Sequence, residues 1–358
     1  MQVELQNVIC WCSRTRRRLS RAMIVTSLLL IVRTASGQRL PALTPVPVPG
    51  SLAALEFKID YTPPFAALPN GTLAFYDLDE NQIVYVNGAT GAETRFGRTG
   101  DGPGEFRAVT EIAPASDGRL VALSPTRITI IGSDQKAFNT VRLARPFAGL
   151  LRPSKDSAFL VGTGYDTVFS ISLRTGETRA RFGQRREDSL HFRGKQPYER
   201  GFWLVPRGEK DWFVASGYKY YVGLEDANGA HRGTIDRAVE PEMPSKSELD
   251  DSRRQLQRGN PKASLDGMMK RMASTPKAFI TSSPVQDAKG RLWVPTGRMR
   301  SDSTEVDIFS AGGKFLGSVR MPGVVRRMAT DKDQLYVITK YIDGRTAGDF
   351  GVLRYRVN

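Results

Sequence analysis

Cysteine and histidine are scarce in this sequence. Its 358 residues include two cysteines, Cys10 and Cys12, and two histidines, His191 and His231. Because no cysteine follows position 12, the rest of the chain can have no disulfide framework, no thiol nucleophile and no thiolate metal ligand. Two imidazoles are also too few for an ordinary zinc site unless carboxylates complete it.

A long hydrophobic run is missing as well. The apolar segment near the amino terminus, Ala22–Val32, is much shorter than the ~20 residues that a membrane-spanning helix needs. It follows arginines within residues 14–21 and precedes the small residues Ala35-Ser36-Gly37, which is the order of an export signal. We therefore predict that residues 1–37 are a signal peptide cleaved near Gly37, and that the mature protein is periplasmic or secreted with no stable membrane span. An uncleaved anchor is the alternative, since Arg33 closely follows the apolar segment.

Acidic residues are fewer than basic residues in this sequence. The chain has 52 lysines and arginines against 37 aspartates and glutamates, a formal net charge of +15. The basic residues are scattered, without a basic helix or an aromatic RNA-binding signature, so we expect no nucleic-acid partner. An exported basic protein is instead attracted to an anionic glycan or an acidic surface, and salt weakens this attraction. A generally soluble basic surface is the alternative.

The sequence does contain a repeated unit of short strands and tight turns. Each unit begins with a turn and an apolar strand, and six such turns recur: Asn70-Gly71, Asp117-Gly118, Lys155-Asp156, Lys210-Asp211, Lys289-Gly290 and Lys332-Asp333. Further turns separate the later β-rich runs, at Asn87-Gly88, Ser133-Asp134, Thr175-Gly176, Asn228-Gly229 and Gly312-Gly313. Four short strands repeated around a ring predict an all-β fold, a six-bladed β-propeller. One or two β-sandwiches are the alternative, although sandwiches lack such a unit.

The bounds of the propeller follow from composition. Residues 38–54 are rich in proline and are predicted to be an extended linker with no core of its own. Leu55–Asp60 then alternates apolar and polar residues, as a half-buried strand does. We place this strand at the outside of the last blade, where it closes the ring and removes an open edge. The propeller is therefore predicted to occupy residues 55–358.

The long interval between the fourth and fifth turns predicts a helical insertion at residues 240–276, between blades 4 and 5. Ser245–Glu248 has the spacing of a capping box, and the following residues favour a helix up to Gln257. A second helix is predicted from about Lys262 to Met272, with an apolar side formed by Leu265, Met268, Met269 and Met272. We expect this side to pack on the propeller. A lid over a ligand is the alternative, because methionine adapts to varied shapes.

One segment, residues 96–106, carries a resemblance to a known family. It reads Phe96-Gly97-Arg98-Thr99-Gly100-Asp101-Gly102-Pro103-Gly104-Glu105-Phe106. It resembles six-bladed propellers of the NHL-repeat type, in particular an exported bacterial group, with weaker echoes at Phe182-Gly183-Gln184 and Phe315-Leu316-Gly317. The resemblance covers about Leu55–Val357. It implies fold more than chemistry, since such propellers include binding platforms, carbohydrate-associated proteins, lactonases and lyases.

Blade topology indicates where a ligand would bind. The connection between the second and third strands of a blade lies on the same side of the ring as the connection to the next blade. We call this side the loop face, and we expect ligands at its end of the central channel. Asp77 and Arg127 lie in such connections, and the helical insertion emerges there too. The ligand-binding residues predicted on the loop face are Tyr165, Asp166, Tyr218, Tyr220, Arg298, Arg300, Asp302 and Tyr341.

The sequence contains no clear catalytic or metal-binding motif. Asp77–Asn81 imitates the opening of a calcium-binding loop, but Gln82 stands where that loop needs glycine and Gly88 where it needs glutamate. No Gly-x-Ser-x-Gly nucleophile motif occurs. We therefore predict no cofactor and no metal ligands, with a calcium site built from channel carboxylates as the alternative.

Together these features predict an exported propeller that acts as a binding platform for a ligand or a protein through its loop face. The alternative is a metal-assisted hydrolase of the lactonase kind, or a lyase, with carboxylate ligands in the central channel. The sequence leaves open whether the protein is an enzyme, and it identifies neither the ligand nor a catalytic residue.

Overall fold

The computed structural model describes most of the chain from Leu40 onward. The chain divides into two units, Met1–Ile31 and Val32–Asn358, and every described residue belongs to the second. The described residues are 40–49, 55–56, 62–151, 153–162, 167–183, 202–207, 211–216, 220–226, 228–237, 239–240, 242–259, 264–274, 276–277, 279–300, 303–340 and 349–358. The predicted signal peptide, residues 1–37, lies outside them. In this described part of the chain, no helix is both long and apolar enough to cross a membrane.

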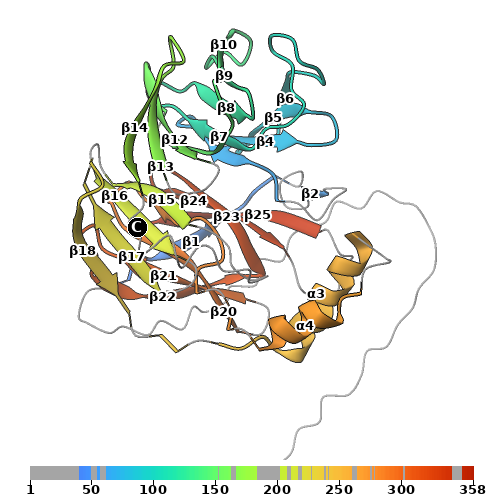
Figure 1. Cartoon of the computed structure of the whole chain (residues 1–358), viewed down its shortest axis with the longest axis vertical. Helices are drawn as coiled ribbons and strands as arrows, with labels where there is room; N and C mark the ends of the chain where they lie inside the picture. The colour runs from blue at the N-terminus through green and yellow to red at the C-terminus, as the bar shows by residue number, and fades with distance from the viewer. Residues whose placement is uncertain are drawn as a thin grey trace, which may run out of the picture. The chain divides into compact units, whose positions relative to one another are not determined.

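The described residues form six antiparallel sheets (Figure 1). Five of these sheets have four strands, and the last has five. Blade 1 contains β3 (Phe65–Ala67), β4 (Thr72–Asp77), β5 (Gln82–Asn87) and β6 (Glu93–Phe96). Blade 2 contains β7 (Glu111–Pro114), β8 (Leu120–Ser124), β9 (Arg127–Ile131) and β10 (Phe138–Arg142). Blade 3 contains β11 (Phe147–Leu151), β12 (Ser157–Gly162), β13 (Thr167–Ser172) and β14 (Thr178–Gly183).

The second half of the ring repeats this arrangement. Blade 4 contains β15 (Phe202–Arg207), β16 (Asp211–Ser216), β17 (Tyr221–Glu225) and β18 (His231–Asp236). Blade 5 contains β19 (Val285–Gln286), β20 (Leu292–Arg300), β21 (Ser303–Phe309) and β22 (Phe315–Pro322). Blade 6 contains β23 (Val324–Asp331), β24 (Gln334–Lys340) and β25 (Asp349–Val357), and it is completed by β1 (Leu43–Val46) and β2 (Leu55–Glu56).

The innermost strands form a closed ring. The first strand of each blade contacts the first strand of the next, from β3 through β7, β11, β15 and β19 to β23, and β23 contacts β3 again. This confirms the predicted six-bladed propeller. The predicted turns fall between the first and second strands and between the third and fourth strands. At the first of them, Gly71 has a φ of 77°, which favours glycine, and Oδ1 of Asn70 accepts the N–H of Thr72 at 3.0 Å.

The apolar core lies between neighbouring blades. One cluster joins blades 1 and 2 around Tyr76 and Phe106, and another joins blades 4 and 5 around Phe213 and Phe309. Trp212 is fully buried and lies edge-on to Phe159 of blade 3, with ring centroids 4.9 Å apart. Because these interfaces are mostly apolar, charged groups buried between two blades need a specific explanation.

Ring closure differs from the sequence prediction. Leu55–Glu56 does pair with β25 of the last blade, as expected of a closing strand. The main closing strand is β1, whose Leu43–Val46 pairs with Val357–Arg354 of β25. This strand lies inside residues 38–54, the segment predicted to be a linker. Pro45 is accommodated because β1 is an outer strand, where a missing backbone N–H need not break a ladder.

The helical insertion begins where the capping box predicts. The first helix, α3, spans Lys246–Gly259. The hydroxyl of Ser245 accepts the N–H of Glu248 at 3.3 Å, and Oε2 of Glu248 accepts the N–H of Ser245 at 2.7 Å. The second helix, α4, spans Asp266–Ala273 and so begins later than the predicted Lys262.

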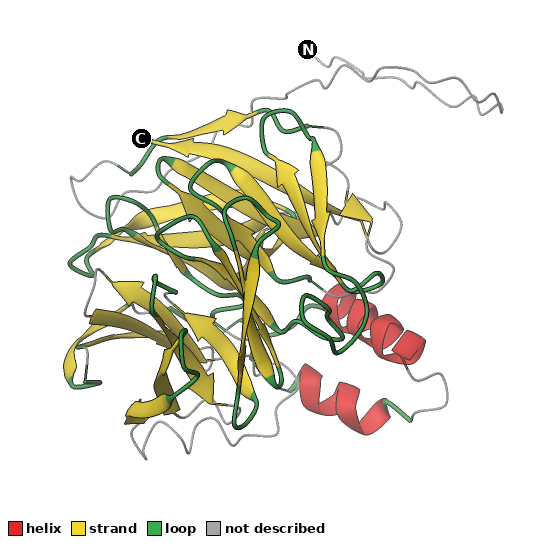
Figure 2. Cartoon of the chain, turned by 90° about the horizontal axis from the view of Figure 1, so that it is seen from above, coloured by secondary structure: helices red, strands yellow, loops and turns green. Residues whose placement is uncertain are grey.

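The apolar side of α4 packs differently from the expectation. Leu265, Met269 and Met272 are buried, and Leu249 and Leu256 of α3 pack against them. Figure 2 shows the two helices close to each other beside the strands. The described residues of this cluster all come from the insertion, so the helices share a small core of their own instead of burying the stripe on a blade.

Candidate functional site

The connections of the propeller are strongly unequal on its two sides. On the side opposite the loop face, which we call the turn face, no connection is longer than the turn at residues 132–137. From β3 onward, four connections are longer than this turn, at residues 97–110, 184–201, 237–284 and 341–348, and each begins on the loop face because it follows a second or a fourth strand. Long connections on a rigid scaffold are where proteins usually place binding groups.

An ion pair bridges the channel near the loop face. Nη1 of Arg327 lies 3.1 Å and 3.3 Å from the two carboxylate oxygens of Glu111. Arg327 belongs to the innermost strand of blade 6 and Glu111 to that of blade 2. Blade 1 separates these two blades, so the pair must cross on the channel side of β3. About a quarter of each side chain remains exposed, at 26% and 25%, which leaves the pair partly accessible to solvent.

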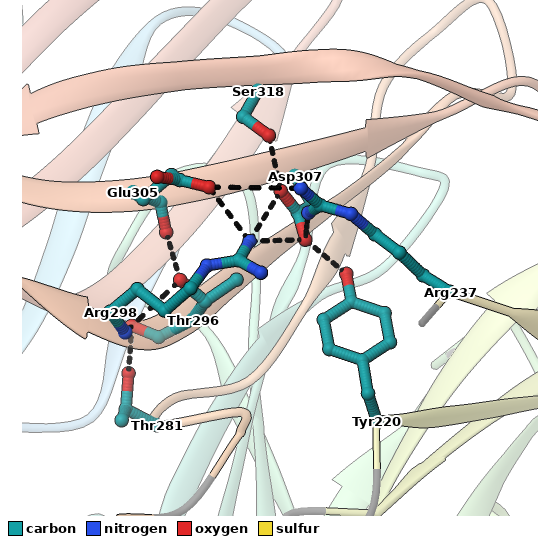
Figure 3. A network of polar contacts seen from close by, with 8 residues as sticks. All are labelled: Tyr220, Arg237, Thr281, Thr296, Arg298, Glu305, Asp307 and Ser318. Atoms are coloured by element: carbon teal, nitrogen blue, oxygen red, sulfur yellow. Dashed lines mark hydrogen bonds and ion pairs between the residues drawn. The ribbon is translucent and has the colours of Figure 1, made fainter. Parts of the chain in front are cut away.

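A network of polar contacts lies between blades 4 and 5, with Asp307 at its centre (Figure 3). We call it the Asp307 network. The carboxylate of Asp307, on β21, is 0% exposed. It accepts hydrogen bonds from the hydroxyls of Tyr220 and Ser318, each at 2.5 Å. One nitrogen of Arg298 donates to both carboxylate oxygens, at 2.8 Å each. Arg237, which follows β18, makes a further ion pair with the same carboxylate.

A second carboxylate balances the charges of the Asp307 network. Oε1 of Glu305 lies 2.8 Å from Arg298 and 3.9 Å from Arg237. Two guanidinium groups therefore face two carboxylates, and the network has no net charge when all four are ionised. Exposure increases outward, from 0% for Asp307 to 11% for Arg298, 16% for Glu305 and 21% for Arg237. Burial raises the pKa of the Tyr220 hydroxyl well above its usual value, and the charge of Asp307 and its hydrogen bond raise it further.

One donor of the Asp307 network is unused. Nε of Arg298 is buried and has no hydrogen-bond partner among the described residues. A buried donor without an acceptor is costly and is usually satisfied by a water molecule or a ligand. The other guanidinium, of Arg237, lies over the ring of Phe315, with its carbon 4.1 Å from the ring centroid.

Both ends of the helical insertion are attached at this network. Arg237 precedes the insertion, and Phe279–Thr281 follows it along β20. The carbonyl of Phe279 accepts the N–H of Gly297 at 3.0 Å, and the hydroxyl of Thr281 donates to the carbonyl of Thr296 at 3.2 Å. The ring of Phe279 also lies edge-on to Tyr220, at 6.4 Å between centroids.

A separate pair of contacts closes the base of the insertion. Nζ of Lys277 lies 3.2 Å from Glu242 and 3.1 Å from Glu248. The backbone N–H of Lys277 also donates to the carbonyl of Glu242 at 2.7 Å. Lys277 is thus held by residues at the opposite end of the insertion, and its side chain is 13% exposed.

The Gly-rich bend that carries the family resemblance is a connection between blades 1 and 2. Oε2 of Glu105 accepts the N–H of Gly102 at 2.7 Å, and Oε1 accepts Nε of Arg98 at 2.8 Å. The hydrogen bond from Gly102 and those from Arg98 lower the pKa of Glu105 below its usual value. Arg127 of blade 2 donates to the carbonyls of Asp101 and Gly102, at 2.6 Å and 3.1 Å. The bend is therefore a rigid structural element, and Arg127, expected on the loop face, is used to hold it.

The structure brings together two of the eight predicted site residues. Tyr220 and Arg298 both bind Asp307, and both are buried, so their main contacts are within the protein. Arg300 ends β20. The other five predicted residues, Tyr165, Asp166, Tyr218, Asp302 and Tyr341, lie outside the described residues, as does His191.

No metal site is evident in the described part of the chain. Among the residues that the structure describes, no three histidine, cysteine, aspartate or glutamate side chains form a group that could hold a metal ion. Asp77, which begins the calcium-like segment, accepts the backbone N–H groups of Asp79 and Glu80 through one oxygen and pairs with Arg95 through the other. These contacts are those of a hydrogen-bonded surface turn.

Sequence reasoning missed the residues at the centre of both charged features. Asp307 and Glu305 lie within a strand and alternate with apolar neighbours, which indicates only that they share a face. Glu111 and Arg327 are 216 positions apart, and nothing local relates them. The one signal in the sequence was that these residues are charged and lie in strands. Charged residues on inner or middle strands of a propeller must find partners when the blades pack.

Comparison with known proteins agrees on the fold. No protein-family model matches the chain, and a search of curated proteins also found no match. A member of the DUF4221 family from Bacteroides vulgatus has a similar structure, with 11% identity and a TM-score of 0.57, covering 90% of this chain and 99% of its own. A protein of unknown function from Bacteroides thetaiotaomicron has 12% identity and a TM-score of 0.53, covering 91% and 76%. A gluconolactonase from Xanthomonas campestris has 12% identity and a TM-score of 0.48, covering 92% and 100%. At these identities the likeness to the first two structures shows the fold alone.

Proposed function

We propose that this protein is an exported β-propeller of the NHL-repeat type that binds a ligand or a protein through its loop face. One observation carries the proposal: from β3 onward, every connection longer than the turn at residues 132–137 begins on that face. The turn face offers only tight turns, which leave few side chains free to adapt to a partner. Long connections on one side of a rigid ring are the usual form of a binding surface.

The charge of the protein supports an anionic ligand or partner. The net charge is +15, and most of this excess remains after removal of the predicted signal peptide. Long-range attraction would concentrate an anionic glycan or an acidic protein surface near the ring. At the loop face, Nε of Arg298 is a buried donor with no acceptor among the described residues, and Arg327, which pairs with Glu111, is 26% exposed. We assign ligand contact to the loop-face residues predicted from the sequence, including Tyr165, Tyr218 and Tyr341.

Binding can be tested on the mature protein without knowing its ligand. The purified protein is analysed for bound metal and then screened by thermal shift against divalent cations, lactones, neutral glycans and polygalacturonate. The proposal expects stabilisation by polygalacturonate that weakens with added salt, because ion pairing is screened. Bound metal together with turnover of a lactone would replace the binding platform with the alternative, a metal-assisted hydrolase.

Export is tested separately. Amino-terminal sequencing of the protein recovered from a cell that makes it should give a chain that begins close to Gln38. A chain that retains residues 1–37 and sediments with membranes would instead support an uncleaved anchor.

A further inference from the structure

His231 takes part in a hydrogen-bonded series that the proposed function does not use. Its Nδ1 lies 2.9 Å from Oε1 of Glu225, and its Nε2 lies 3.1 Å from the hydroxyl of Thr234. All three residues belong to the outer hairpin of blade 4, formed by β17 and β18. A carboxylate, an imidazole and a hydroxyl in this order are the arrangement that activates a hydroxyl nucleophile.

A β-bulge brings these side chains together. Residues three positions apart in a regular strand point to opposite faces, so His231 and Thr234 would normally be separated. Here Glu225 pairs with His231 and Leu224 pairs with Gly233, which leaves Arg232 as an extra residue in β18. The bulge shifts the alternation by one position and places His231 and Thr234 on the same face as Glu225. No sequence motif marks this arrangement.

The hydrogen-bond partners fix the roles of the two imidazole nitrogens. An ionised carboxylate can only accept, so Nδ1 of neutral His231 carries the proton that Glu225 receives. Nε2 is then the acceptor, and the hydroxyl of Thr234 donates to it. This is the tautomer that a general base needs, with its free lone pair directed at the proton to be removed.

The three side chains become more exposed from Glu225 through His231 to Thr234. The side chain of Glu225 is 13% exposed and that of His231 is 26% exposed, whereas Thr234 is at the surface. The residue opposite Thr234 on β17 is Gly223, which has no side chain to cover the hydroxyl. Among the described strands, β18 has a neighbour on one side only, so alternate backbone N–H groups along it lack strand partners. Donors of this kind can stabilise an oxyanion.

We propose that Thr234 is a nucleophile toward carboxylic esters, with His231 as its general base and Glu225 as the residue that positions the imidazole. The oxygen of Thr234 adds to the ester carbonyl carbon while its proton passes to Nε2 of His231. The tetrahedral intermediate then expels the alcohol, which takes that proton. A water molecule gives a proton to the same nitrogen and attacks the acyl-threonine, so the carboxylic acid leaves and Thr234 regains its hydroxyl.

The test uses p-nitrophenyl acetate as the probe and the mature protein as it is exported. The release of nitrophenolate is followed, and samples quenched in acid are digested and analysed by mass spectrometry for acetylated peptides. We expect an acetyl group on Thr234 and release above the buffer rate. Thr234→Val and His231→Gln should abolish the adduct, whereas Thr234→Ser should retain it, because serine keeps the hydroxyl.

Glu225→Gln tests the positioning role. The amide can donate to Nδ1 and favour the wrong tautomer, so acylation should slow by at least about tenfold while KM stays unchanged. Thermal unfolding of each variant checks that the fold is retained. The proposal is overturned if no acetyl group is found on Thr234 and Thr234→Val releases nitrophenolate at an unchanged rate. This outcome includes the case in which His231 alone catalyses hydrolysis. Neither result bears on binding at the loop face, since the hairpin of β17 and β18 turns on the other side of the ring.

Discussion

The replacement Asp307→Asn removes the negative charge at the centre of the Asp307 network and leaves its volume unchanged. Asp307 is 0% exposed, and Tyr220 and Arg298 are also buried, so these two donors have little access to water when they lose their partner. Arg298 and Ser318 donate to one carboxylate oxygen, and Tyr220 and Arg298 donate to the other. Whichever way the amide of asparagine turns, its NH2 group faces at least one donor. Arg237 also loses the charge with which it pairs.

The expected loss of stability follows from this geometry. Removing one partner of a buried charge pair costs about 3–5 kcal/mol, because the remaining charge is left buried and uncompensated. Glu305 stays 2.8 Å from Arg298 and offsets part of this cost. We therefore expect the free energy of unfolding to fall by about 3 kcal/mol, at the lower end of that range.

Urea denaturation measures this change when tryptophan fluorescence and far-ultraviolet circular dichroism give coincident transitions with an unchanged slope. The matched control is Glu177→Gln, which removes the charge of a surface pair with Arg179. The two side chains of that pair are 61% and 73% exposed, so the control should change stability by no more than about 1 kcal/mol. If Asp307→Asn costs no more than the control, the Asp307 network does not hold blades 4 and 5 together and this reasoning is wrong.

Three further predictions follow from other contacts. Lys277→Met should increase hydrogen exchange in α3 and α4 and leave the blades unchanged, because it removes the ion pairs to Glu242 and Glu248; Lys270→Met, on the exposed side of α4, is the control. Gly97→Ala should destabilise the protein by about 1–3 kcal/mol, since φ is 90° and a Cβ would overlap the ring of Phe106; Gly267→Ala in α4 has room and should not. Burial raises the pKa of Tyr220 and Tyr336 above the usual 10.0, so the folded state keeps protons that the unfolded state loses. Stability measured by urea should therefore fall as pH rises above about 10, and an unchanged urea midpoint would contradict this assignment.

The strand order of the fold was predictable because its signals are local. Turns such as Asn70-Gly71 and Asp117-Gly118 are set by a glycine with positive φ, 77° and 85°, next to a side chain that bonds the backbone two positions on. Ring closure was not fully predictable, because β1 pairs with β25 across the whole length of the chain. Pro45 also disguises that strand, since proline usually argues against a ladder position.

The candidate site was predictable only as a side of the ring. Topology alone placed Tyr220 and Arg298 near the loop face, but it did not indicate that both turn inward to Asp307, 87 positions from Tyr220. The same limit applies to Thr234 and His231, which meet only because one residue bulges out of β18. Side chains that are brought together by distant pairing or by a bulge leave no pattern in the local sequence.

Site-specific photo-cross-linking on the two sides of the ring tests the central claim most directly. Benzoylphenylalanine is introduced at Leu78 and Thr126, which are exposed in short connections of the loop face, and at Lys155 and Ala288, which are exposed in turns of the turn face. The proteins are irradiated in a cell that makes them, and cross-linked products are identified whether they are protein or glycan. We predict products from Leu78 or Thr126 and none above background from Lys155 or Ala288. Products from the turn-face positions alone, or equally from both sides, would contradict binding through the loop face.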